Sequence, residues 1–110
     1  MSERMRQFYA EQLEYLKAGD ARQLVEAHYQ PDASLVTVER VTTGRDSLIA
    51  LFEGYIKQIG SFEVRTDKFQ ATDNTVMIEA TLTSQLGVSR VYDVFVLRDG
   101  KISYHFAGVM

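Results

Sequence analysis

The second half of the chain constrains the fold most. Four segments there show the two-residue alternation of β-strands, and only short connections separate them: residues 62–69, 75–86, 90–97 and 102–109. The alternation is lost near Lys68 in the first of these segments. Strands joined by short connections are antiparallel. The sequence therefore predicts an antiparallel sheet that must bury one face against other elements.

The first half supplies those elements. Apolar residues at helical spacing predict helices, and Asp20 with Gln23 forms a capping box. Pro31 ends the second helix, and Thr43 is the expected cap of the third. The predicted order is helix 2–18, helix 21–29, strand 33–38 and a helix that ends near Gly60. Helices grouped ahead of an antiparallel sheet define an α+β protein, and 110 residues form a single domain, residues 1–110.

Composition excludes several classes of function. Twelve basic and fifteen acidic side chains give a net charge of −3, without the basic stripe that nucleic-acid or anionic-membrane binding needs. The chain has no cysteine, and its two histidines form no metal motif, so we expect neither metal nor cofactor. No run approaches the roughly 20 apolar residues of a membrane span. The first residues also lack a signal peptide's apolar segment, which predicts a cytoplasmic protein.

The segment 90–97 is apolar on both faces. Helices can cover only one face, so the other, which includes Tyr92, Val94 and Val96, needs a different cover. A second copy of the chain is the economical cover, and it predicts a homodimer formed through the sheet. The alternative is that a loop covers these side chains.

Four segments together resemble a known family. They are residues 16–20 (LKAGD), 29–33 (YQPDA), 43–44 (TG) and 93–102 (DVFVLRDGKI). In order and spacing the whole chain is similar to the NTF2-like superfamily, in particular to SnoaL-like proteins and ketosteroid isomerase. The resemblance implies a cone in which helices pack on a curved, mixed, mainly antiparallel sheet around an internal pocket, and a homodimer. It implies no single reaction, because the superfamily includes enzymes and proteins without chemistry.

Asp93 is the first candidate for chemistry, because a carboxylate lies there among apolar strand residues. Inside a pocket, burial would favour its protonated form, which can donate a hydrogen bond. By resemblance it matches the aspartic acid of the oxyanion hole in ketosteroid isomerase, an enzyme that also serves as a standard example of this effect. The alternative is a structural carboxylate bonded to a backbone amide or to Arg90.

Gln12 is the second candidate. It shares a helix face with Phe8 and Leu16, so a buried amide there must find partners. By resemblance this position carries the catalytic tyrosine of the isomerase, and glutamine is a much poorer acid. The alternative is a side chain at the edge of the apolar stripe that reaches water.

Two further positions follow from the resemblance. Thr37 falls where the isomerase has its general base, and threonine cannot abstract a proton unaided. Glu39 and Asp32 are the carboxylates near it. Tyr29 matches a tyrosine that supports the isomerase's hydrogen-bond network.

His105 is the third catalytic candidate, and its role depends on the preceding turn. A two-residue loop, Asp99-Gly100, would pair Val94 with His105. A three-residue loop would pair Asp93 with His105 and make a general base with an orienting acid, and the resemblance favours this register. His28, at the end of the second helix, is expected to be structural and to interact with the helix dipole.

Aromatic residues complete the predicted pocket. We expect ligand contacts from Tyr9, Tyr29, Thr37, Phe52, Tyr55 and Phe95, and a ligand that is flat, small, and mostly apolar or aromatic. Three functions remain open at this point. They are cofactor-free acid–base catalysis on a carbonyl compound, with Asp93, His105 and Gln12 as catalytic residues, ligand binding without turnover, and protein interaction or dimerisation.

Overall fold

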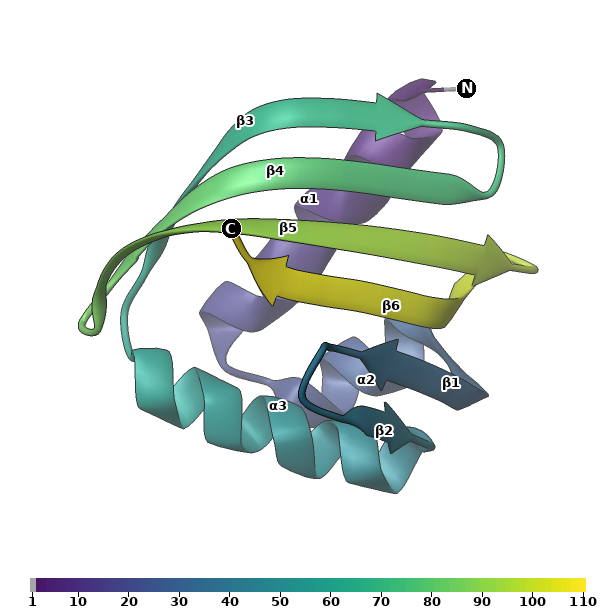
Figure 1. The fold of residues 1–110 in the computed structure, drawn as a ribbon. Helices are drawn as coiled ribbons and strands as arrows, with labels where there is room; N and C mark the ends of the chain where they lie inside the picture. The colour runs from purple at the N-terminus through teal and green to yellow at the C-terminus, as the bar shows by residue number, and fades with distance from the viewer. Residues whose placement is uncertain (1) are drawn as a thin grey trace.

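Three helices pack against one curved six-stranded sheet in the computed structural model, which describes residues 2–110 (Figure 1). The elements are α1 (Ser2–Ala18), α2 (Ala21–His28), β1 (Tyr29–Val36), β2 (Val41–Thr43), α3 (Arg45–Ile59), β3 (Glu63–Ala71), β4 (Thr75–Ser84), β5 (Gly87–Arg98) and β6 (Lys101–Val109). This arrangement confirms the α+β fold that the resemblance implied. No helix in the described part of the chain is both long and apolar enough to cross a membrane.

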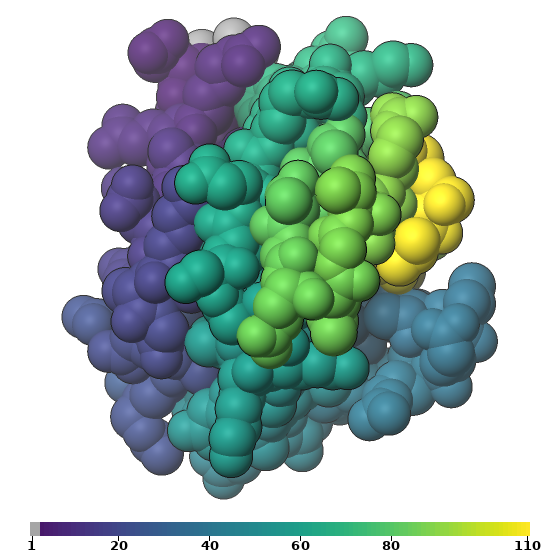
Figure 2. All heavy atoms as spheres, turned by 90° about the vertical axis from the view of Figure 1, so that its left-hand side faces the viewer, coloured from purple at the N-terminus to yellow at the C-terminus, as the bar shows by residue number. Residues whose placement is uncertain are grey.

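The sheet has the strand order β2-β1-β6-β5-β4-β3. All neighbours are antiparallel except β1 and β6, which are parallel, so the sheet is mixed as expected. Figure 2 shows the end of the molecule where the β4–β5 hairpin (green), the C-terminus (yellow) and the β1–β2 loop (blue) gather.

Two predicted boundaries around β1 were wrong. The strand begins at Tyr29, directly after α2, because the backbone of this buried residue is already extended. It ends before Thr37, whose hydroxyl accepts hydrogen bonds from the N–H groups of Glu39 and Arg40. This turn reverses the chain into β2, a strand too short for the alternation to reveal.

The predicted helix caps had different outcomes. Asp20 caps α2 as expected, because its carboxylate accepts a hydrogen bond from the Gln23 N–H at 3.0 Å. Thr43 does not cap α3. Its hydroxyl instead bonds Ser34 across the β1–β2 pair at 2.8 Å, and Gly44 takes the cap position without a side-chain bond.

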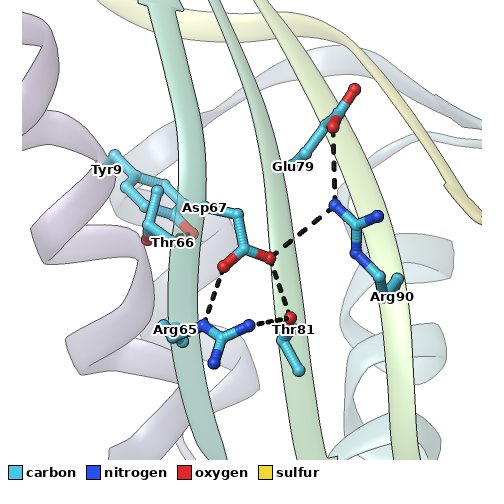
Figure 3. Close-up of polar contacts among 7 residues, drawn as sticks. All are labelled: Tyr9, Arg65, Thr66, Asp67, Glu79, Thr81 and Arg90. Atoms are coloured by element: carbon cyan, nitrogen blue, oxygen red, sulfur yellow. Dashed lines mark hydrogen bonds and ion pairs between the residues drawn. The ribbon is translucent and has the colours of Figure 1, made fainter.

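A β-bulge explains why the alternation fails near Lys68. The β3–β4 register shifts between Thr66 and Lys68, which leaves Asp67 as the extra residue. In Figure 3, Thr66 points toward Tyr9 of α1, whereas Asp67 lies with Arg65, Thr81 and Arg90 on the other face of the sheet. Lys68 pairs with Glu79 on the same face as Asp67, so the bulge places two neighbouring residues, Asp67 and Lys68, on one side of the sheet and interrupts the alternation.

A second irregularity sets the β5–β6 register, and neither predicted register is right. Asp99 and Gly100 form a two-residue turn with positive φ values of 53° and 80°. The register then shifts by one residue, so that Phe95 lies opposite His105 and Asp93 opposite Ala107. Asp93, Phe95 and His105 therefore share one face of the sheet, with Asp93 diagonal to His105.

The helices cover the face that Phe95 shares, and that face holds the core. The opposite face, called here the outer face, carries apolar side chains at its centre: Met77, Tyr92, Val94, Val96, Tyr104 and Phe106. Met77 and Tyr104 are each about half exposed, and the Tyr104 and Phe106 rings are stacked. Within residues 2–110 no helix or loop covers this face.

Candidate functional site

A cavity of about 510 Å³ lies between the helices and the inner face of the sheet. This volume is within the range of small-molecule sites. Its wall is mostly apolar, with contributions from α1, α3 and the central strands: Leu13, Leu16, Leu35, Leu51, Ile78 and Val91. Glu39 and Arg40, from the β1–β2 loop seen in Figure 2, also line it.

All but one of the predicted site residues line this cavity: Tyr9, Gln12, Thr37, Phe52, Tyr55, Asp93, Phe95 and His105. The exception is Tyr29, which is fully buried behind the wall. Tyr29 therefore does not contribute to the cavity wall, its hydroxyl contacts His105, and its predicted ligand contact stays a prediction. Thr37 is on the wall, but its hydroxyl is engaged in the turn already described.

Asp93 brings a carboxylate into this apolar wall. Its side chain is 25% exposed, and its Oδ1 lies 2.6 Å from His105 Nε2. Arg90, the predicted structural partner, extends from the outer face toward Asp67 and Glu79 (Figure 3). Arg90 and Asp93 are three residues apart in a strand, so their side chains point to opposite faces.

Both ring nitrogens of His105 are occupied. Nε2 contacts Asp93, and Nδ1 lies 2.9 Å from the Tyr29 hydroxyl. His105 is 5% exposed, so no ring nitrogen is free to take a proton from a ligand in the cavity. The Asp93 carboxylate therefore lines the cavity, while both ring nitrogens of His105 face protein groups, and the predicted catalytic roles of the two residues stay predictions.

Gln12 continues the contacts away from the cavity. It is 2% exposed, which excludes the predicted alternative of a side chain that reaches water. Its Nε2 donates to the Tyr29 hydroxyl at 2.9 Å, and its Oε1 lies 2.7 Å from His28 Nδ1. His28 also lies 3.4 Å from Glu11, which is on the surface.

Sequence reasoning did not place His28 in this chain of contacts. His28 is the last residue of α2, as predicted, but its ring also stacks on Phe8 at 4.1 Å between centroids and so reaches α1. The available signal was its position on the buried face of α2, next to Leu24 and Val25. A single sequence does not reveal which buried group on another helix it contacts.

Burial sets the ionisation of the groups around the cavity. It raises the pKa of Tyr9 and of Tyr55, and the nearby negative charge of Asp93 raises both further. Burial also raises the pKa of Tyr29 far above its ordinary range. The pKa of His28 is lowered, because burial outweighs the attraction of Glu11. All three phenols are hydrogen-bond donors at neutral pH, and His28 is uncharged.

The hydroxyl of Tyr9 has a proton available for a ligand. Thr66 donates a hydrogen bond to the Tyr9 oxygen at 3.3 Å, so the phenol's own proton is not needed there (Figure 3).

Residues 2–110 contain no group of three or more side chains that could hold a metal ion.

Helices over a curved mixed sheet, with a cavity between them, define the NTF2-like class of α+β proteins. The sequence profile of the SnoaL-like domain matches residues 5–105. The chain therefore belongs to the SnoaL-like domain family. Comparison of the sequence with curated proteins gave no match.

Three solved structures illustrate the likeness. An NTF-2-like protein of unknown function from Burkholderia xenovorans LB400 is 21% identical, with a TM-score of 0.81 over 98% of this chain and 84% of that one. A de novo designed protein with a curved β-sheet is 22% identical, with a TM-score of 0.83 over 100% and 88%. A protein proposed to be a SnoaL-like polyketide cyclase, from Jannaschia Sp. CCS1, is 15% identical, with a TM-score of 0.74 over 91% and 83%. At these identities the likeness establishes the fold alone.

Proposed function

We propose that this protein is a cofactor-free acid–base enzyme that acts on a small, mostly apolar carbonyl compound. The observation that carries the proposal is the Asp93 carboxylate, which is held at one oxygen by His105 inside an apolar cavity. A carboxylate in such surroundings is a competent general base when its second oxygen faces the substrate. Within the described residues that second oxygen, Oδ2, has no hydrogen-bond partner.

The proposed step is removal of a proton from the carbon next to the carbonyl. Asp93 Oδ2 takes the proton, the C–H electron pair forms an enolate, and the Tyr9 hydroxyl donates a hydrogen bond to the enolate oxygen. Return of the proton to another carbon completes an isomerisation. Attack of the enolate carbon on a second carbonyl, followed by proton transfer from Asp93 to the new alkoxide, completes an aldol-type cyclisation.

The wall indicates the body of the substrate. Phe52 and Phe95 offer aromatic surface beside Asp93, and Tyr55 adds a neutral hydroxyl. A flat molecule with one or two oxygens fits this distribution of groups. The polyketide-cyclase description of the Jannaschia protein is consistent with substrates of this kind.

Binding without turnover is the second candidate. The observations that favour it are Gln12 and Thr37, which stand where the resemblance places a catalytic tyrosine and a general base. Both side chains are engaged in internal hydrogen bonds and have no free acidic or basic group.

We also propose that the protein is a homodimer formed through the outer face. Tyr104 and Phe106 give this face an exposed aromatic centre, and the charged side chains of Figure 3 lie at its β3 side. An apolar centre with a polar rim is the usual anatomy of an interface. The predicted cytoplasmic location stays a prediction.

Exchange of α-protons in D₂O tests the proposed proton transfer without knowledge of the natural substrate. A polycyclic monoketone, whose α-protons exchange slowly without a catalyst, is incubated with the protein, and loss of its α-proton signal is followed by NMR. We expect Asp93→Asn to slow exchange by about 10²–10⁴-fold, with binding changed less than about tenfold.

Asp32→Asn is the matched control, because Asp32 is exposed and pairs with Arg98 outside the cavity. Equal exchange by wild type and Asp93→Asn would contradict the proposal. Binding with no exchange by wild type would favour the second candidate.

A further inference from the structure

Four polar side chains in the interior form one continuous chain of hydrogen bonds. It runs from His28 through Gln12 and Tyr29 to His105, and it ends on Asp93 in the cavity. The four are at most 5% exposed. Burying such groups is costly unless each one is satisfied, and every buried side-chain nitrogen and oxygen in residues 2–110 has a partner.

With the Gln12 amide oriented as the structure has it, the donors and acceptors of this hydrogen-bond chain run in one direction. Gln12 offers its N–H to Tyr29, so its carbonyl oxygen must accept from His28, which therefore carries a proton on Nδ1. Tyr29 accepts from Gln12, so its single proton is donated to His105 Nδ1. A neutral His105 then carries its proton on Nε2 and donates it to Asp93 Oδ1.

We infer that Gln12 and Tyr29 are positioning residues that fix the tautomer of His105 and so keep Asp93 an acceptor. Neither residue needs to touch a substrate for this role. All four hydrogen bonds point toward Asp93, and aligned bonds of this kind strengthen one another. The inference rests on the proposed function and deepens it, since it explains why Asp93 accepts a hydrogen bond from His105 and does not donate one.

A single substitution, Gln12→Glu, would reverse the last part of this hydrogen-bond chain. In Gln12→Glu the new carboxylate has nearly the same shape and can only accept. It would accept from His28 Nδ1 and from the Tyr29 hydroxyl at once. Tyr29 would then have to accept from His105, which requires a proton on His105 Nδ1. The substitution therefore inverts the last part of the chain.

Nitrogen NMR of the imidazole rings tests the inference without any substrate. The protein has two histidines, so the spectrum contains the signals of two rings. The His28→Asn variant lacks one of them and so assigns both. In wild type at neutral pH we expect opposite neutral tautomers, with the proton on Nδ1 in His28 and on Nε2 in His105. In Gln12→Glu we expect a protonated Nδ1 on His105 and α-proton exchange slower by at least about tenfold.

Gln23→Glu is the matched control, because it adds the same charge on the exposed side of α2. We expect it to leave both rings and the exchange rate unchanged. A proton on His105 Nδ1 in wild type would overturn the inference, and this reading remains decisive if Gln12→Glu does not fold. An unprotonated Nδ1 in folded Gln12→Glu would also overturn it. The expected tautomers together with no exchange by wild type would retain the inference and reject the enzymatic proposal.

Discussion

Two aspartates show how placement decides what a carboxylate can do. Asp67 lies on the outer face, where Arg65 and the Thr81 hydroxyl lower its pKa and Arg90 adds a weaker attraction. Its oxygens are occupied by these partners (Figure 3). Asp93 has His105 as its partner at one oxygen and lines the cavity with the other. The first holds the strands of the sheet together, and the second is the proposed base.

The lowered pKa of His28 gives a prediction about stability. An unfolded histidine titrates near 6.5, above the value in the folded protein. Between these values the unfolded chain binds more protons, so the contribution of His28 to stability is complete above pH 6.5 and is lost as the pH falls. We expect the free energy of unfolding to fall less between pH 7 and pH 5 in His28→Asn than in wild type.

Urea unfolding at the two pH values measures this difference. The groups that face His28 are Glu11, which raises its pKa, and Lys101, which lowers it. Phe8 and Tyr15 pack against the ring and carry no charge. If the free energy of unfolding falls equally between pH 7 and pH 5 in wild type and variant, the pKa of His28 is the same in the folded and the unfolded protein.

At the scale of elements, the curved sheet depends on close contacts between strands. Gly108 of β6 lies opposite Tyr92 of β5, and the tyrosine ring covers it. A methyl group at residue 108 would come within 2.6 Å of this ring. The ring could then remain on the outer face only if it moved away from β6.

We therefore expect Gly108→Ala to displace the Tyr92 ring and to destabilise the protein by no more than about 1 kcal/mol, because the clashing atoms are the outer end of a half-buried side chain and not a packed core. Thermal unfolding measures the effect. Gly54→Ala is the control, because a methyl group at that helical position meets no atom within 4 Å. Equal losses in the two variants would contradict this account of Tyr92.

The elements also show which parts of the fold a single sequence predicts. Long, periodic segments such as α1 and β4 were predicted within two residues, because hydrophobic periodicity determines them locally. The parallel β1–β6 pair and the short β2 were not predicted, since both depend on contacts between distant residues. The contact between Asp93 and His105 was expected, but from a register that the extra residue in β6 replaces.

At the scale of the whole molecule, the two faces of the sheet have different surroundings. The inner face shapes the cavity, and the outer face has an apolar surface that the single chain leaves open. A dimer through the outer face would leave each cavity between the helices and the inner face of its own subunit.

We expect sedimentation at micromolar concentration to give twice the chain mass of 12.5 kDa. Phe106→Ser should weaken the dimer at least about tenfold, since a central aromatic residue is the type that dominates interface energies. Val38→Ser is the control, because Val38 is 89% exposed in the β1–β2 loop. A wild-type mass of 12.5 kDa would reject the dimer.

The buried chain that ends on Asp93 has a consequence for how the sequence can evolve. Each of His28, Gln12 and Tyr29 satisfies its neighbour, so a change at one leaves an unpaired group in the interior, at a cost of about 1–3 kcal/mol. Replacing all three together with His105 by apolar residues removes that penalty, because His105 Nδ1 would otherwise lose its Tyr29 partner. We therefore expect these positions to be inherited as a block in related chains, kept together where the carboxylate is used and lost together where it is not.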